Sequence, residues 1–160
     1  MLSFWEKDEF LNYDHIIVGA GIVGLSTAIS IKENYPKARV LVLERGTFPT
    51  GASTKNAGFA CFGSLTEILS DLKLMPEQEV FDLVKLRWEG LQLLRERVGD
   101  EALDYHNLGG YELMRSADMP ALEEMNRVNA LLMPLFGQRV YHDRSEEIEK
   151  LGFDASVIEG

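Results

Sequence analysis

The chain has only one cysteine, Cys61, among its 160 residues. A single cysteine excludes an internal disulfide, which favours a reducing compartment. No apolar stretch is long enough to cross a membrane, and the N-terminus lacks the basic and apolar regions of a secretory signal. We therefore expect a cytoplasmic protein with no transmembrane segment, in which Cys61 is a small buried residue.

Positive charge is also scarce. The sequence has 16 lysine and arginine residues against 26 aspartate and glutamate residues, which gives a formal net charge of −10. This balance disfavours a nucleic-acid groove or an anionic membrane surface as a partner. The three histidines, His15, His106 and His142, do not have the spacing of metal ligands, so no metal site is expected.

What the sequence does contain is the pattern of a dinucleotide-binding unit in residues 14–58. An apolar run at 15–18 leads into three glycines with the spacing GxGxxG, which are Gly19, Gly21 and Gly24. A helical pattern follows at 22–33, and a second apolar run at 40–43 ends in Glu44, 20 residues after Gly24. All the contextual requirements of the fingerprint are met. The order strand, helix, strand predicts a right-handed parallel crossover.

Each residue type in this pattern has a chemical reason. Gly19 allows a tight turn, Gly21 leaves room for a pyrophosphate, and Gly24 lets the helix pack closely on the sheet. The N–H groups of the helix that begins near Ile22 would face the phosphates. Glu44 would accept a hydrogen bond from a ribose 2′-OH and would repel a 2′-phosphate, so NADP is the least expected dinucleotide.

The fingerprint alone leaves FAD and NAD open, because both cofactors use it. The loop at 51–58 is rich in small and hydroxyl side chains, which suits a second contact to the pyrophosphate and a close approach to a flat ring system. This loop favours FAD. An NAD-dependent dehydrogenase and a non-catalytic truncated module are the alternatives.

Residues 14–28, 43–45 and 51–58 together resemble the N-terminus of the D-amino-acid oxidase (DAO) family of FAD-dependent oxidoreductases. That family includes glycine and sarcosine oxidases, D-amino-acid dehydrogenases and gamma-glutamylputrescine oxidoreductases. The resemblance implies FAD as the cofactor and a small-molecule amine or amino acid as the substrate, oxidised by hydride transfer from the C–H next to nitrogen to the flavin.

The resemblance also implies residue roles. It places the FAD pyrophosphate on Gly19, Gly21, Ile22, Val23 and Gly24, the adenosine ribose on Glu44, the adenine beside Arg45, the phosphates also on Ala52 and Ser53, and the flavin or the substrate near Asn56, Ala57 and Gly58. No catalytic residue is assigned, because we expect that chemistry beyond residue 160.

Family members are longer than this chain, so we expect an N-terminal fragment that is inactive alone and that self-associates through exposed apolar surface. The expected fold is α/β. Residues 1–63 would form an N-terminal arm, anchored by its aromatic side chains, and a Rossmann-like part. Residues 64–160 would form a helical connection and the incomplete beginning of an α+β substrate domain. In that second part we expect helices at 65–74, 77–98 and about 118–136, strands at 103–106, 110–115 and 139–142, and a short helix after Ser145.

Overall fold

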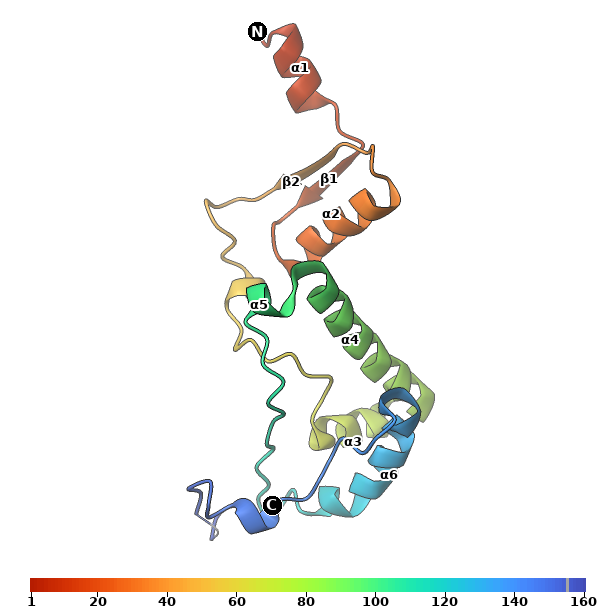
Figure 1. Ribbon diagram of the computed structural model, residues 1–160, viewed down its shortest axis with the longest axis vertical. Coiled ribbons are helices and arrows are strands. Elements are labelled where there is room, and N and C mark those ends of the chain that lie inside the picture. Colours follow the sequence, from red (N-terminus) through yellow and green to blue (C-terminus); the bar gives the residue numbers. More distant parts are fainter. Residues whose placement is uncertain (155) are drawn as a thin grey trace. The chain divides into compact units, whose positions relative to one another are not determined.

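The computed structural model describes residues 1–154 and 156–160, apart from the side chain of Glu9. The chain forms two compact units, Met1–Phe59 and Ala60–Gly160 (Figure 1). The first unit contains α1 (Phe4–Leu11), β1 (His15–Val18), α2 (Ile22–Asn34), β2 (Val40–Leu43) and a 3₁₀ turn, η1 (Ala52–Thr54). The second contains α3 (Leu65–Leu74), α4 (Glu77–Val98), α5 (Asp100–Leu103), α6 (Pro120–Phe136) and a 3₁₀ turn, η2 (Ser145–Glu147).

The first unit is a βαβ crossover. β1 and β2 pair in parallel, with His15 opposite Val40 and Val18 opposite Leu43. Both predicted strands are confirmed, and α2 is one residue longer than predicted. α2 ends at Asn34 because Pro36 disfavours helical backbone in the residue before it. The Lys32 ammonium group then donates hydrogen bonds to the carbonyls of Pro36 and Ala38, at 2.6 and 2.9 Å.

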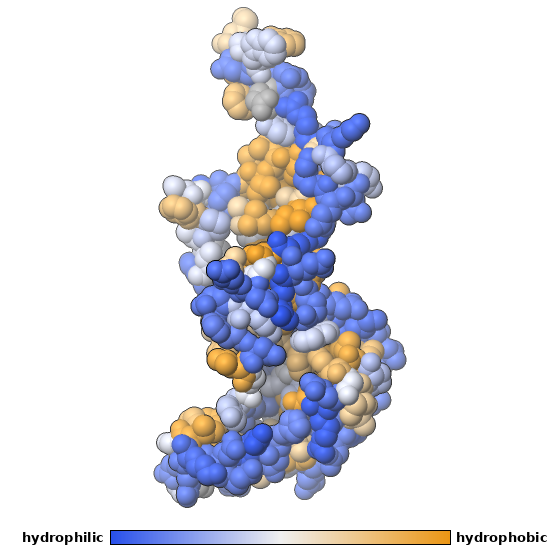
Figure 2. Space-filling model, in the orientation of Figure 1, coloured by the Kyte–Doolittle hydropathy of each residue, from blue (hydrophilic) through white to orange (hydrophobic). Residues whose placement is uncertain are grey.

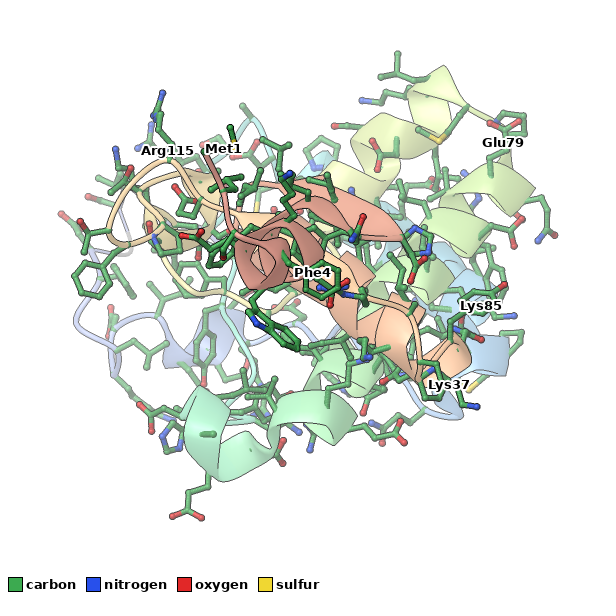
Figure 3. The ribbon with its side chains drawn as sticks, turned by 90° about the horizontal axis from the view of Figure 1, so that it is seen from above. Met1, Phe4, Lys37, Glu79, Lys85 and Arg115 are labelled. Carbon is green, nitrogen blue, oxygen red and sulfur yellow. The ribbon has the colours of Figure 1, made fainter. Side chains whose placement is uncertain are left out.

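The N-terminal arm is a short helix. Ser3 and Glu6 form a reciprocal capping box at the start of α1. The expectation that aromatic side chains anchor this arm is wrong for Phe4, Trp5 and Phe10, which are all exposed. Figure 3 labels Phe4 on this helix. Its described link to the sheet is polar, since Arg39 donates to the Asp8 carbonyl at 2.7 Å.

Apolar side chains in the first unit remain open to solvent. Every fully buried hydrophobic side chain in the described part of the chain lies in the second unit. Val18 on β1 is 86% exposed and Val23 on α2 is 77% exposed. Figure 2 shows apolar residues gathered over the two strands. A two-stranded sheet has little independent stability, so this unit depends on further packing.

The second unit has the core. Helices α3, α4 and α6 enclose a cluster of buried side chains: Leu65, Ile68, Val80, Val84, Met114, Val128 and Leu132. The helices predicted at 65–74 and 77–98 are confirmed, and the third begins at Pro120 rather than near Asp118. Proline suits the first turn of a helix because its missing N–H would have no partner there.

The strands predicted at 103–106, 110–115 and 139–142 are wrong. Leu103 instead ends α5, and Asp104 follows in left-handed backbone with φ 50°. Among the residues that the structure describes, β1 and β2 form the only sheet. The expected α+β character of residues 64–160 is therefore absent from the described structure. Short apolar and aromatic segments, two of them around a turn at 107–109, predicted strands here, but a strand also needs a neighbouring backbone to pair with.

Residues 139–142 show why a predicted strand does not form. The side chain of Asn129, only 3% exposed, accepts hydrogen bonds from the N–H groups of Val140 and Tyr141 at 2.9 and 3.0 Å. Its amide group donates to the Tyr141 carbonyl at 2.9 Å. One side chain on α6 thus satisfies the backbone groups that a partner strand would otherwise satisfy.

The expectation that Cys61 is buried is also wrong, since that side chain is exposed.

Candidate nucleotide-binding site

The turn between β1 and α2 depends on its glycines. Gly19 follows β1 with φ 101°, a backbone conformation that residues with a side chain rarely adopt. Its N–H donates to the Leu43 carbonyl at 2.7 Å, which extends the pairing of the strands into the turn. The chain can then reverse sharply and start α2 at Ile22.

The other two glycines are required by space. A Cβ on Gly24 would lie 2.1 Å from the Gly19 carbonyl oxygen and 3.2 Å from Cγ2 of Ile17, so the helix packs against the turn with no room for a methyl group. A Cβ on Gly21 would lie 2.9 Å from Oγ of Ser53. Because Gly21 has no side chain, the Ser53 hydroxyl can lie against the start of the helix.

The N-terminus of α2 is the electropositive part of this site. Gly21 is its N-cap residue and has no side chain to cap the helix. The N–H of Ile22 donates instead to Oγ of Ser53 at 2.9 Å, across 31 residues of sequence. Unpaired N–H groups and the helix dipole at such an end favour an anion. The arrangement can therefore hold a phosphate group.

Glu44 lies beside the turn, directly after β2. Its carboxylate accepts hydrogen bonds from the N–H of Ala20 at 2.9 Å and from the N–H of Gly46 at 3.1 Å. These two bonds, first that of Ala20 and then that of Gly46, lower the pKa of Glu44 below its ordinary value of 4.5. The carboxylate is thus ionised and fixed at the carboxyl ends of the strands, where it can also accept from a hydroxyl group.

The loop at 51–58 is ordered by its own polar groups. The Thr54 hydroxyl lies within hydrogen-bond distance of the Pro49 and Gly51 carbonyls, at 3.1 and 3.2 Å. The Asn56 amide group donates to the carbonyls of Ala52 and Ser53, both at 3.2 Å, and its oxygen accepts from the N–H of Gly58 at 2.7 Å. The loop is therefore a shaped segment with exposed side chains.

The structure brings together six of the residues that the sequence singled out. Five of them lie around the start of α2 through the contacts and close approaches described above: Gly19, Gly21, Ile22, Gly24 and Ser53. The sixth, Glu44, is held to the same turn by the N–H of Ala20. The other six are exposed on α2 or on the segment after β2: Val23, Arg45, Ala52, Asn56, Ala57 and Gly58. Sequence reasoning missed the N–H of Ala20 as a partner of Glu44, because a backbone donor leaves no signal in residue type.

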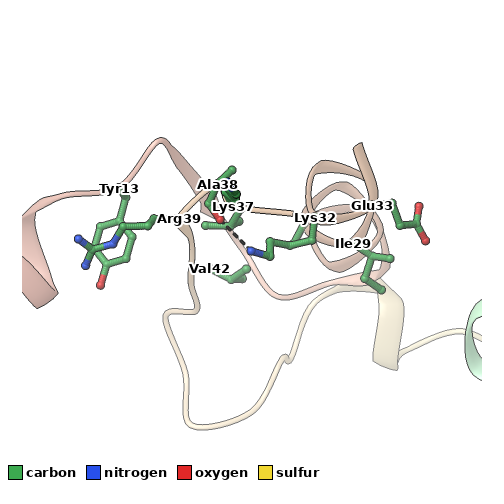
Figure 4. Close-up of a pocket in the computed structure, with 10 residues that line it drawn as sticks. Tyr13, Ile29, Lys32, Glu33, Lys37, Ala38, Arg39 and Val42 are labelled. Carbon is green, nitrogen blue, oxygen red and sulfur yellow. Dashed lines mark hydrogen bonds between the residues drawn. The ribbon is translucent and has the colours of Figure 1, made fainter. Parts of the chain in front are cut away.

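A cleft lies elsewhere in the first unit. It has a volume of about 790 Å³ and is lined by residues from the end of α2, the connection after it and β2, among them Ile29, Lys32, Arg39 and Val42 (Figure 4). The guanidinium of Arg39 lies 5.4 Å from the ring centre of Tyr13. Because the cleft includes Val40, at the amino end of β2, it is separate from the glycine turn at the carboxyl end of β1.

Comparison with known families identifies the class of protein. Residues 14–155 match the model of the DAO family, described as FAD-dependent oxidoreductases, and the chain therefore belongs to that family. FAD is the family's cofactor. The residues present fit its ADP portion, since the turn combines a glycine without a side chain at Gly21, a helix N-terminus and an ionised acid after β2.

The similar curated proteins share a short stretch with this chain. The L-2-hydroxyglutarate dehydrogenases of Salmonella houtenae and Escherichia coli K12 are each 46% identical over 37 residues, which is 23% of this chain and 9% of the relative. Glucose oxidase of Penicillium chrysogenum is 44% identical over 48 residues, 30% of this chain and 8% of that protein. The shared stretch thus spans less than a tenth of each relative, and these relatives are more than twice as long as the chain. No solved structure matches.

Two further findings concern membranes and metals. Within the described residues, no helix combines the length and apolar character needed to span a bilayer. The same part of the chain holds no group of three or more His, Cys, Asp or Glu side chains placed to bind a metal ion.

Proposed function

We propose that this chain binds the ADP portion of FAD at the start of α2 and forms the nucleotide-binding part of an enzyme that oxidises an amine or amino acid. The observation that carries the first part is the missing side chain of Gly21, at a helix N-terminus and beside an ionised carboxylate. A pyrophosphate needs the space and the N–H groups, and a ribose needs the carboxylate.

The proposed roles follow this geometry. The pyrophosphate lies over Gly21 against the first turn of α2, where Ile22, Val23 and Gly24 supply N–H groups. Glu44 accepts hydrogen bonds from the adenosine ribose, and Arg45, exposed next to it in sequence, lies beside the adenine.

The loop after β2 completes the proposed site. Ala52 and Ser53 lie at the phosphates, while Asn56, Ala57 and Gly58 approach the flavin or the substrate. The Asn56 amide group donates its hydrogen bonds to carbonyls of its own loop and so shapes this segment, which leaves small residues at the surface. A flat ring system can approach such a surface closely.

The reaction proposed is removal of a hydride from the carbon next to the substrate nitrogen, and FAD supplies the electron acceptor when bound. The chain's own residues bind and orient the cofactor. We propose that the groups that hold the substrate lie beyond residue 160 and that residues 64–160 begin the substrate domain, so that this chain alone is inactive. The support for this is the greater length of the curated relatives.

A second candidate substrate is a 2-hydroxy acid. The observation in its favour is the stretch shared with L-2-hydroxyglutarate dehydrogenases, enzymes whose name states a hydroxy-acid substrate. In both cases a hydride leaves a carbon that bears a heteroatom, so the two candidates differ in what the substrate site recognises.

The first test is the visible absorption spectrum of the purified chain after it has been mixed with FAD and separated from the excess. We expect the retained flavin bands to report binding, and we expect the Glu44→Ala variant to retain less flavin. Binding of NAD in place of FAD by the chain would contradict the proposal. In a longer form of the protein that carries the substrate domain, bleaching of the flavin bands without oxygen by amines or amino acids, but not by 2-hydroxy acids, would distinguish the two substrate classes.

A further inference from the structure

Two distances place the Ser53 hydroxyl oxygen at the first turn of α2, where the proposed function puts the pyrophosphate. It accepts the hydrogen bond of the first N–H of α2, that of Ile22, at 2.9 Å. It also lies 2.9 Å from the position that a Cβ on Gly21 would occupy. The hydroxyl thus fills the space that the glycine leaves open and uses the N–H group that points into it.

We propose that Ser53 is a placeholder for the cofactor: its hydroxyl caps α2 in the FAD-free chain and gives up the Ile22 N–H to a phosphate oxygen when FAD binds. This inference rests on the proposed function, since it concerns the same site. It adds that Ser53 lies beside the phosphates in the complex without holding them, because binding exchanges its hydroxyl for a phosphate oxygen as the acceptor of the Ile22 N–H.

The exchange is physically reasonable in both states. A helix N-terminus without a capping acceptor is destabilised, and a serine hydroxyl is among the preferred caps. A phosphate oxygen carries charge, so it forms a stronger hydrogen bond with an N–H than a neutral hydroxyl does. One N–H does not serve both acceptors well, so the phosphate displaces the hydroxyl.

The loop can permit this exchange at little cost. Ser53 is exposed, and the hydrogen bonds that shape the loop come from Thr54 and Asn56 rather than from the Ser53 side chain. Rotation of the Ser53 side chain therefore releases Ile22 and leaves the rest of the loop hydrogen-bonded.

The proposal has an unusual consequence for affinity. If the hydroxyl competes with the phosphate, its removal raises the free energy of the FAD-free chain and leaves that of the complex nearly unchanged. The variant Ser53→Ala should then bind FAD more tightly, by about fivefold for a cap of ordinary strength. If Ser53 instead held the phosphate directly, the same substitution would weaken binding.

The experiment measures FAD affinity by flavin fluorescence, together with the amide signal of Ile22 by NMR. We expect S53A to tighten binding, to shift the Ile22 signal in the FAD-free chain, and to give the same Ile22 signal as the unaltered chain once FAD is bound. Thr54→Ala is the matched control, because Thr54 lies in the same 3₁₀ turn but bonds only to loop carbonyls. It should leave the Ile22 signal unchanged.

The proposed exchange is contradicted if S53A binds FAD with unchanged or weaker affinity. It is also contradicted if the Ile22 signals of the two FAD complexes still differ. These outcomes are distinct from a failure of the proposed function. If the proposed function is wrong, neither the unaltered chain nor S53A binds FAD, and both the binding site and the exchange are contradicted.

Discussion

Gly24→Ala is the substitution that tests most directly whether the glycine turn sets cofactor binding. The added Cβ would lie 2.1 Å from the Gly19 carbonyl oxygen, and real Cβ atoms essentially never approach closer than 3.0 Å. The neighbouring atom is backbone, so it cannot rotate away. The start of α2 must therefore move from the turn by about 1 Å, and the N–H groups proposed to bind phosphate move with it.

The size of the effect follows from this strain. Forcing a methyl group into a closely packed place costs roughly 1–3 kcal/mol. Alanine also favours a helix over glycine by about 1 kcal/mol, which offsets part of that cost. If the strained turn must return to its original geometry to bind FAD, the cost appears as weaker affinity, by roughly 5- to 150-fold before the offset.

The assay is FAD titration of G24A followed by flavin fluorescence, with Gly90→Ala as the matched control. Gly90 lies inside α4, and a Cβ there would have no heavy atom within 4 Å. We expect G90A to leave FAD affinity unchanged and to stabilise the second unit by about 0.5–1 kcal/mol. Equal FAD affinities of G24A and the unaltered chain would refute the reasoning about the turn.

Three further predictions concern stability, pH and association. Asn129→Ala leaves the N–H groups of Val140 and Tyr141 and the Tyr141 carbonyl without their partner, so we expect a loss of roughly 2–4 kcal/mol in chemical denaturation; a loss below about 1 kcal/mol would contradict the role of Asn129. Because the folded-state pKa of Glu44 is lowered, the carboxylate contributes stability above pH 4.5, and this is lost as the pH falls through the lowered pKa. The Ala20 amide signal should therefore titrate with a midpoint below 4.5, and a midpoint at or above that value would exclude this account. We also expect the chain to self-associate through the exposed face of β1, and Val18→Lys to reduce the association in analytical ultracentrifugation; equal sedimentation of variant and unaltered chain would argue against that surface.

The βαβ part of the first unit could be predicted from sequence, because its signals are local, whereas the helix α1 and the 3₁₀ turn η1 were not predicted. The two apolar runs, the glycine spacing and Pro36 set β1, α2 and β2 within one residue of their observed bounds. The position of Glu44 beside the turn follows from the same order of elements, since parallel strands end at the same edge of a sheet.

The extended segments of the second unit could not be predicted in this way. Val140 and Tyr141 at 139–142 are compatible with a strand, yet the side chain of Asn129 takes the hydrogen bonds that a strand would need. The segment 110–115 could not be predicted either. Met114 exchanges backbone hydrogen bonds with residues 159 and 160, but these bonds do not form a β-ladder. Whether a segment becomes a strand depends on a partner far away in the sequence, which the pattern of the segment does not contain.

The sequence by itself thus determined the family, the FAD fingerprint and the βαβ order, because glycine spacing and hydrophobic periodicity act over a few residues. Only the tertiary structure decided which atoms meet at the start of α2. The Ser53 hydroxyl reaches Ile22 across 31 residues, and the Ala20 N–H reaches Glu44 across 24. Both contacts exist because the crossover returns the chain to the same edge of the sheet, where hydrogen-bonding groups pair by distance in space rather than by separation in sequence.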